Sequence, residues 1–198
     1  MKKIIITFAA IMCFVTLLFI SCSTPVGLTS WKNPQGNAQI SKLIVMALFD
    51  KLTYTDPFER QLVSYFSSQN LKSIPSLDFM APFQKYEAVD LQKKFDSLGA
   101  DALVIFSVKG KDVSINTSGG YYGGYRGYWG GGGQVWTTTT LSLRANLYTV
   151  KNDALIWTGD LTVTDPNDIN SVSQQIAKTV FADWLKNNLL KNPPPATK

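Results

Sequence analysis

The segment Ser97-Leu98-Gly99-Ala100-Asp101-Ala102-Leu103-Val104 decides the fold, because it joins the end of an expected helix to the start of an expected central strand. Over residues 88–98 the apolar side chains recur at helical spacing, and Gly99 suits the left-handed residue that ends many helices. The run from 102 to 108 is then continuously apolar, as in a strand that is buried on both faces. We therefore expect a helix that leads into the centre of a sheet.

A similar unit precedes this segment. Residues 42–49 form another continuous apolar run, and a helix start follows at Asp56-Pro57-Phe58-Glu59, with Asp56 as the cap and Glu59 reaching back as in a capping box. Residues 71–77 form a weaker strand. Pro75 within it predicts a place at the sheet edge, because proline lacks the N–H that a central strand needs.

Downstream, the apolar period changes from helical spacing to two. Alternation over residues 141–148, a turn at 151–153 and alternation over 155–163 predict an antiparallel hairpin with one wet face. Asp165-Pro166-Asn167-Asp168 repeats the helix-start signal, with Asp165 as the expected cap. A long amphipathic helix follows to about residue 190.

These elements give the order β-α-β-α-β-β-β-α within residues 41–190. Two right-handed βαβ crossovers followed by an antiparallel meander predict an α/β domain with a mixed five-stranded sheet in the order 2-1-3-4-5. Three helices are expected to cover this sheet, in two or three layers. About 150 residues is the usual size of a single domain and is enough for one substantial core.

The N-terminus has the pattern of a bacterial export signal. Met1-Lys2-Lys3 supplies a basic start, residues 4–20 are uncharged and mostly apolar, and Ser21 and Cys22 follow. A retained transmembrane helix is the alternative, because the run is at the short limit of what spans a hydrocarbon core. The cysteine at the end of the run favours a cleaved leader over residues 1–21.

The end of this run, Phe19-Ile20-Ser21-Cys22, resembles the lipobox of bacterial lipoproteins. The resemblance implies that the Cys22 thiol is lipidated, that the leader is removed before it, and that the new N-terminus receives an acyl chain such as palmitate. Residues 22–40 are then expected to form a tether and the proline-rich residues 191–198 a disordered tail. By the same resemblance we expect an outer-membrane protein that faces the periplasm.

Composition excludes several classes of function. Histidine is absent, which removes the commonest metal ligand and the commonest general base. The formal net charge is +5, two of these charges lie on the leader's Lys2 and Lys3, and no long basic stripe follows, so we expect no nucleic-acid partner. Cys13 would leave with the leader, so that no intramolecular disulfide could form. We expect neither a cofactor nor a metal.

Two phrases carry a wider resemblance: residues 97–104, quoted above, and Leu147-Tyr148-Thr149-Val150-Lys151-Asn152-Asp153-Ala154-Leu155-Ile156-Trp157-Thr158-Gly159. With the element order, they resemble a group of small envelope lipoproteins that includes the curli-secretion lipoprotein, the Lpo-type activators of peptidoglycan synthases and the N-terminal domain of the Tol-Pal propeller protein. The resemblance covers roughly residues 41–190, and its motifs are structural. It implies a non-enzymatic, membrane-anchored domain that binds or positions another envelope component.

A glycine-rich segment at 119–133 is not explained by the fold. It interleaves glycine with aromatic residues, so it is too flexible for a core and too aromatic for an ordinary linker. Such a surface could stack on a sugar, contact a protein or contact a lipid headgroup. The alternative is a loop tip without a partner. The candidate binding residues are Tyr121, Tyr122, Tyr125, Arg126, Tyr128 and Trp129.

Catalytic arrangements are weak by comparison. Ser41 and the lysine after it form the nearest serine–lysine pair, and they open a strand rather than a helix. The carboxylate pairs Asp50 with Asp56 and Asp160 with Asp165 could act in a hydrolase only if folding brought them together in a cleft. We therefore predict no enzyme. The expected function is a protein-interaction or scaffolding module of the cell envelope, with a peptidoglycan- or glycan-binding module as the alternative.

Overall fold

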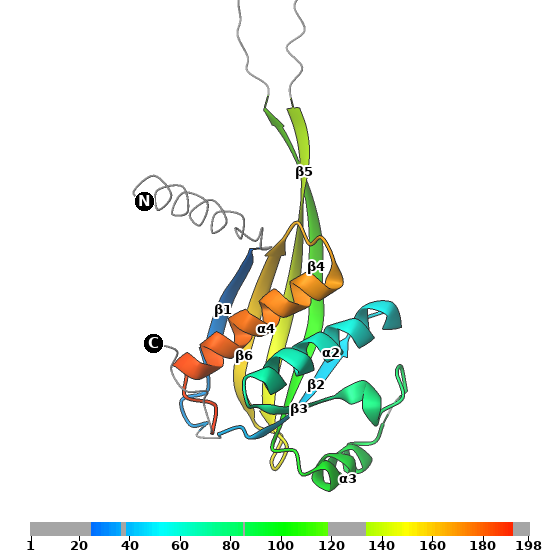
Figure 1. Ribbon diagram of the computed structural model, residues 1–198, viewed down its shortest axis with the longest axis vertical. Helices are drawn as coiled ribbons and strands as arrows, with labels where there is room; N and C mark the ends of the chain where they lie inside the picture. Colours follow the sequence, from blue (N-terminus) through cyan, green and yellow to red (C-terminus); the bar gives the residue numbers. More distant parts are fainter. Residues whose placement is uncertain (1–24, 37–38, 85, 119–133, 192–198) are drawn as a thin grey trace, which may run out of the picture.

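The computed structural model describes residues 25–36, 39–84, 86–118 and 134–191. Within these residues the chain forms a six-stranded sheet with helices on both faces (Figure 1). In chain order, the elements are β1 (Val26–Lys32), β2 (Lys42–Leu48), α2 (Leu52–Ser68), β3 (Lys72–Pro75), the 3-10 helix η1 (Ser76–Asp78), α3 (Ala88–Leu98), β4 (Ala102–Ser118), β5 (Gln134–Thr149), β6 (Leu155–Thr164) and α4 (Ile169–Lys186).

The sheet is mixed, with the strand order β1-β6-β5-β4-β2-β3. β2 pairs in parallel with β3 and with β4, whereas the other pairs are antiparallel. The parallel pairs arise from the two crossovers through α2 and α3, as the sequence predicts. The expected strands keep their neighbours. The expected count of five and the order 2-1-3-4-5 are nevertheless wrong, because β1 adds a sixth strand beside β6.

Part of the segment expected as a tether, residues 22–40, is therefore a strand. β1 pairs with β6 along its whole length, from Val26 opposite Val163 to Lys32 opposite Trp157. Val26 packs against the main core cluster, as does Leu28 two residues later. Burial of these side chains and a full ladder of backbone hydrogen bonds hold the segment on the sheet.

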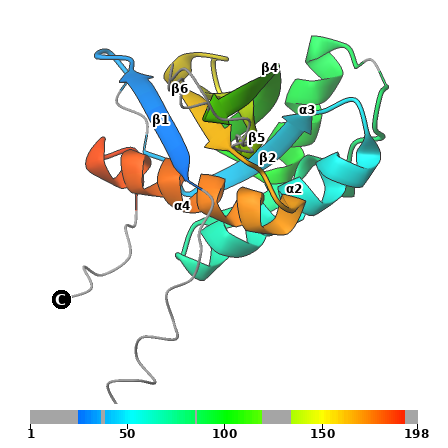
Figure 2. The same ribbon diagram turned by 90° about the horizontal axis from the view of Figure 1, so that it is seen from above.

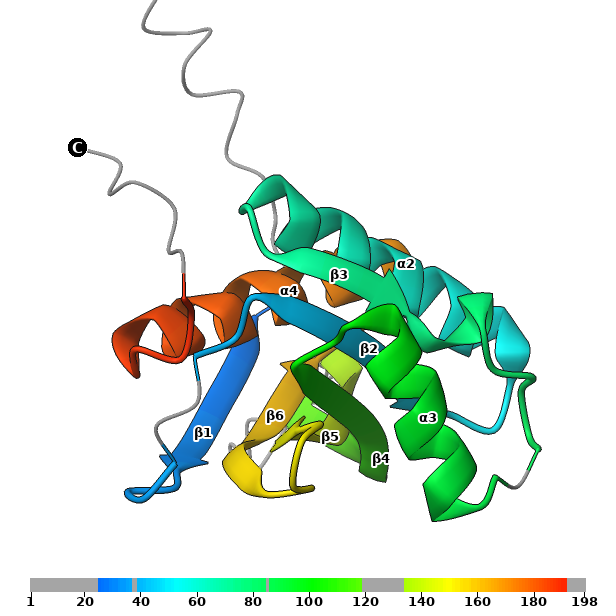
Figure 3. The same cartoon turned by 90° about the horizontal axis from the view of Figure 1, so that it is seen from below.

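The helices form two unequal layers. α2 and α4 lie together over one face of the sheet, and α3 lies on the other face (Figure 2, Figure 3). On that second face a smaller cluster joins Phe95 of α3 to Ile44 of β2 and to Val150. In the described part of the chain no helix covers this face over β1, β6 and β5 (Figure 3). Among the helices in the described ranges, none combines the length and apolar character that crossing a membrane requires.

The main core is rich in aromatic rings. Trp157 of β6 and Trp184 of α4 are both fully buried and meet edge to face, with ring centroids 5.7 Å apart. The Phe66 ring of α2 lies 5.3 Å from the Trp184 ring, so three rings join α2, α4 and β6. The Trp157 indole N–H donates to the Asp183 carboxylate at 2.7 Å, which satisfies the polar atom of that buried ring. The core position of Trp157 is the one that the alternation predicts.

The predicted start of the first helix is wrong. α2 begins at Leu52 without a side-chain cap, so that Pro57 lies inside the helix rather than at its first position. Asp56 does not cap the helix; its carboxylate accepts a hydrogen bond from the Arg60 guanidinium at 2.7 Å. Pro57 has no N–H to donate to the Thr53 carbonyl, so the helix lacks one backbone hydrogen bond in its second turn.

The cap of α4 is also displaced from the predicted residue. Asp168 is the cap, and its carboxylate accepts from the backbone N–H groups of Asn170 and Ser171, each at 2.9 Å. Asp165 has a left-handed backbone, with φ of 48°, and its carboxylate accepts from the N–H of Thr139 at 2.7 Å. The Asp-Pro dipeptide therefore ends a strand here rather than starting a helix.

Other local predictions are confirmed. Gly99 ends α3 with a left-handed backbone, at φ of 61°. Pro75 lies in β3, which is an edge strand. The chain turns between β5 and β6 at residues 150–152, which overlap the predicted 151–153.

β4 and β5 are much longer than the strands predicted at 102–108 and 141–148. They stay paired from Ala102 opposite Thr149 to Ser118 opposite Gln134, past the ends of the neighbouring strands. We name this extension, residues 111–118 and 134–141, the arm. Figure 1 shows it projecting beyond the rest of the domain.

Candidate functional site

The residues that the sequence singles out lie outside the described part of the chain. This holds for the lipidation candidate Cys22 and for the glycine-rich segment 119–133 with its candidate binding residues. The structure does fix where both join the domain. β1 begins four residues after Cys22, and the glycine-rich segment connects Ser118 to Gln134, which pair at the end of the arm.

Within the described residues most of the arm has no neighbouring strand on either side, since only its Thr140 and Leu141 pair with β6. β2 pairs with β4 only as far as Ser107, and β6 pairs with β5 only as far as Thr140. Two-stranded ribbons are marginally stable in water, and free strand edges readily pair with other chains. The arm is therefore a candidate contact element rather than part of the folded core.

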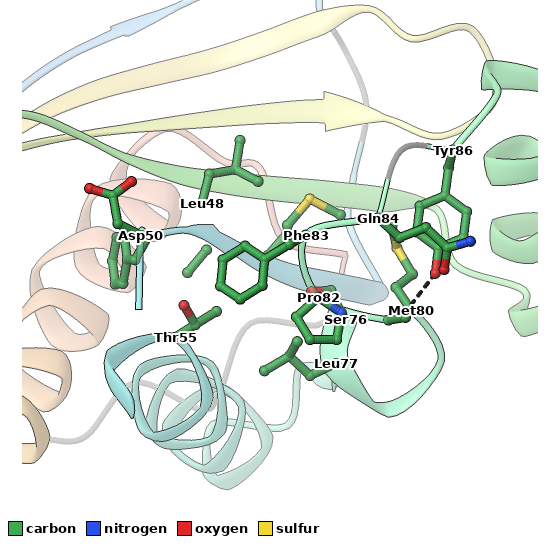
Figure 4. A pocket seen from close by; sticks show the side chains of 14 residues that line it. Leu48, Asp50, Thr55, Ser76, Leu77, Met80, Pro82, Phe83, Gln84 and Tyr86 are labelled. Carbon is green, nitrogen blue, oxygen red and sulfur yellow. Dashed lines mark hydrogen bonds between the residues drawn. The ribbon is translucent and has the colours of Figure 1, made fainter. Parts of the chain in front are cut away.

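A cleft of about 440 Å³ opens beside the carboxyl end of β2 (Figure 4). β3 ends at Pro75, opposite Val45, so β2 continues past its neighbour, and residues 76–86 fill only part of the space. Leu48 and Phe83 are exposed at this cleft. Figure 4 shows apolar side chains around it, with Met80 and Leu77 among them. The cleft is thus an open, largely apolar hollow.

Glu59 is fully buried and contacts three residues that line this cleft. Its Oε1 accepts from the Ala47 N–H and from the Ser76 hydroxyl, each at 2.8 Å, and its Oε2 accepts from the Leu77 N–H at 3.2 Å. Burial raises the pKa of Glu59 above its ordinary value, although these hydrogen bonds oppose the shift. The predicted capping box is therefore wrong. β3 ends before it reaches Ala47, and the Glu59 carboxylate instead accepts the hydrogen bond from the Ala47 N–H. Glu59 thus connects α2 to β2 and to η1.

The uncovered face of the sheet presents ordered polar side chains beside an exposed aromatic ring. Arg144 donates two hydrogen bonds to Asp160, at 2.7 and 2.8 Å, and the bond from Arg144 lowers the pKa of Asp160. The Thr158 hydroxyl donates to Asn146 at 2.6 Å. Trp31 of β1 lies opposite Thr158 and is 50% exposed. We name these five residues the open face; it is the wet face that the hairpin alternation predicts.

A second hollow, of about 510 Å³, lies at the base of the arm between the first turns of α2 and α4. We name it the helix-end groove. Val108 of β4 is 48% exposed here. The apolar side chains around the groove include Phe49, Tyr54, Phe58, Leu141, Leu143, Ile169 and Val172.

The arrangements considered for catalysis have structural partners. Ser41 donates through its hydroxyl and its backbone N–H to the carboxylate of Asp101, which fastens the start of β2 to the start of β4. Asp56 pairs with Arg60, and Asp160 pairs with Arg144. Within the described ranges, no three His, Cys, Asp or Glu side chains gather closely enough to hold a metal ion. The described residues thus present three candidate contact surfaces: the cleft beside β2, the helix-end groove and the open face.

The sequence analysis missed the roles of two residues, Trp31 and Glu59. Trp31 lies in the expected tether, where the only strand signal is the short alternation of Val26 and Leu28 among turn-forming residues. Glu59 carries a detectable signal, because it follows Phe58 and stands three residues before Leu62, on the apolar side of the helix. A carboxylate at such a position must find donors once it is buried.

No protein-family model matches the sequence, and no curated protein matches it significantly. Solved structures with a similar shape exist. A PelC dodecamer from Paraburkholderia phytofirmans is 13% identical, with a TM-score of 0.48, over 85% of this chain and 100% of that one. Lipoprotein GNA1162 from Neisseria meningitidis is 15% identical, with a TM-score of 0.42, over 74% of this chain and 99% of that one. The hypothetical protein CT253 from Chlamydia trachomatis is 10% identical, with a TM-score of 0.42, over 76% and 98% of the two chains. TM-scores below 0.5 are too low to transfer a function.

Proposed function

We propose that the protein is a non-enzymatic lipoprotein of the bacterial cell envelope, whose α/β domain binds another envelope protein. The leader pattern and the lipobox-like Phe19-Ile20-Ser21-Cys22 support an anchor at Cys22. The proposed location is the outer membrane, with the domain in the periplasm. The absence of histidine and the structural partners of Glu59 and Asp160 favour binding over catalysis.

The open face is the observation that carries the binding role. Aromatic and arginine side chains are enriched at protein interfaces, and Trp31 and Arg144 lie two strands apart on this face. Arg144 and Asn146 are already held by their partners Asp160 and Thr158, so binding would cost little side-chain entropy. Beside this face the outer edge of β1 has no neighbour in the described sheet, which offers a partner strand a place to pair.

Crosslinking and capture of envelope proteins by the membrane-bound protein tests this role. Trp31→Ala and Arg144→Glu should each lose most of the captured partner, because the first removes the exposed ring and the second reverses a charge on the open face. Lys72→Ala on β3, at the far edge of the sheet, is the matched control and should capture as the unaltered protein does. Equal capture by all three variants would show that the open face is not the contact.

The glycan alternative has its own readout, sedimentation with purified peptidoglycan. The variant for it replaces residues 119–133 with an Asn-Gly turn between Ser118 and Gln134. Sedimentation of the unaltered protein that is lost only in this variant would favour a glycan-binding module over a protein-binding one.

A further inference from the structure

The register of the sheet places the start of β1 at the base of the arm. Val26 lies opposite Val163 of β6, Val163 lies opposite Leu141 of β5, and Leu141 lies opposite Lys111 of β4. These residues form one row across the sheet, and the arm begins at this row. β1 therefore begins at the end of the domain from which the arm projects (Figure 1).

The arm is longer than the link to the proposed anchor. Val26 lies four positions after Cys22, and a fully extended chain of four steps spans at most about 14 Å. From Leu141 to Gln134 the arm extends by seven residues, or about 23 Å at about 3.3 Å per residue. A bilayer that holds Cys22 is therefore within reach of the arm. The alternative orientation places the bilayer along the outer edge of β1, away from the arm.

The exposed apolar side chains distinguish these two orientations. Among the described residues five large ones lie on the arm, beside its base or at the start of α2, with exposed fractions between 43% and 58%. We name these five the arm-end surface: Leu48, Leu52, Tyr54, Val108 and Val113. Phe83, at 73%, lies at the cleft beside β2 with Leu48. On β1, by contrast, Trp31 is the one large apolar side chain that is at least as exposed, and it lies near the end of the strand remote from Val26. Clustered apolar exposure of this kind marks an interaction surface.

Charge does not explain this end of the domain. The helix-end groove at the base of the arm is lined by Lys51 and Lys111 and equally by Asp50 and Asp168. The charges balance, so long-range attraction to an anionic surface would be weak. Any contact here rests on burial of apolar side chains, which salt does not screen.

We propose that the arm-end surface lies against the bilayer that holds the lipid of Cys22. The inference rests on the proposed anchor, because the short link between Cys22 and β1 is what brings this end of the domain to the membrane. The arm then lies along the bilayer surface, because a two-stranded ribbon with free edges cannot enter hydrocarbon, and the strand starts at Lys42 and Lys72 are directed away from the lipid. The open face is turned to the side, where a protein partner can reach it.

Photocrosslinking from single positions tests the orientation. Benzoylphenylalanine replaces Val113 or Leu48 on the arm-end surface, Thr29 on β1, or Lys72 at the opposite end of the sheet. The acylated protein is taken from membranes and reconstituted in vesicles of phosphatidylethanolamine and phosphatidylglycerol. If mass spectrometry shows that the protein is not acylated, the same variants are coupled to the vesicles through the Cys22 thiol and a maleimide lipid. A failure of the anchor is thereby separated from a failure of the orientation.

The expected result is a lipid adduct from positions 113 and 48 and none from position 72. The adducts should also form when the vesicles are irradiated at high salt. Adducts from position 29 but not from 113 would show that the domain lies on its side, and would overturn the proposal. Adducts that join position 113 to a second copy of the chain, without lipid, would overturn it in favour of self-association through the arm.

Discussion

Glu59 shows how one side chain can set the shape of a cleft. Its carboxylate accepts from the Ala47 N–H, the Ser76 hydroxyl and the Leu77 N–H, and so joins three segments that no strand pairing connects. β3 could not supply these acceptors, because it ends at Pro75. The cleft beside β2 therefore depends on a buried carboxyl group held by hydrogen bonds, an arrangement that is costly to break.

Replacing Glu59 with Ala is expected to lower the free energy of unfolding by at least about 2 kcal/mol, because buried donors lose their acceptor. Glu59→Gln keeps one acceptor oxygen but turns an amide donor toward the Leu77 N–H, so a smaller loss is expected. Denaturant unfolding measures both, with the exposed Glu87→Gln as the control. No loss in Glu59→Ala would mean that water replaces the carboxylate without cost.

The stability that Glu59 contributes should also depend on pH. Burial raises its pKa in the folded protein above the ordinary value of 4.5, so the folded state holds the proton more tightly than the unfolded state. The contribution is therefore full below about pH 4.5 and falls as the pH rises through the folded pKa. Unfolding curves at about pH 5 and about pH 8 should show native stability declining relative to Glu59→Gln. The opposite slope would mean that the hydrogen bonds outweigh burial.

Trp157 is the residue whose loss should cost most in the core. Its ring is fully buried, packs on Trp184 and donates to Asp183. Trp157→Ala is expected to reduce the free energy of unfolding by about 3–5 kcal/mol, as large-to-small changes in cores do. Trp31→Ala, at an exposed ring, is the matched control and should change it by less than about 0.5 kcal/mol. Equal effects of the two changes would place Trp157 outside the core.

At the scale of elements, the parts with strong local patterns were predictable and the parts held by tertiary contacts were not. The continuous apolar runs that became β2 and β4, and the glycine that ends α3, need no partner to be recognised. β1 escaped because its strand pairing depends on β6, more than a hundred residues away. The pairing of the arm escaped because its threonine-rich segment, residues 137–140, has high β propensity but no apolar alternation that would indicate a partner strand.

β1 should therefore be needed for stability. A domain that begins at residue 41, the boundary predicted from the sequence, exposes Leu161 and Val163 of β6 and removes Val26 and Leu28 from the core. Relative to a domain that begins at residue 23, we expect it to lose at least about 2 kcal/mol. Thermal unfolding of the two forms measures this. Equal melting temperatures would mean that β1 does not stabilise the domain.

The glycine-rich segment should make no such contribution. Ser118 and Gln134, which it joins in sequence, pair at the end of the arm, remote from the core, so an Asn-Gly turn in place of residues 119–133 can close the same ribbon. We expect the free energy of unfolding to change by less than about 0.5 kcal/mol. A domain unfolded by this change would show that the segment is structural.

At the scale of the whole molecule, three surfaces point in different directions. The arm and the start of β1 share one end, and the open face lies across β1, β6 and β5. The cleft beside the end of β2 lies toward the β3 edge of the sheet and shares Leu48 with the arm-end surface. The sequence predicted a wet face on the hairpin but could not place Trp31 beside it, because that neighbour comes from an unforeseen strand. The sequence therefore indicated that the hairpin has a polar, solvent-facing side, but not which residues of other strands lie beside it.

Everything proposed at this scale depends on the anchor at Cys22, and the mass of the N-terminal tryptic peptide tests that anchor most directly. Trypsin should release the peptide Cys22–Lys32 from the membrane-derived protein, because no basic residue lies between them. We expect its first residue to be Cys22, with a diacylglycerol thioether on the sulfur and an acyl chain on the amine. A peptide that begins at Ile4 and carries a free Cys22 thiol would show a retained apolar helix instead, and would contradict the lipoprotein account.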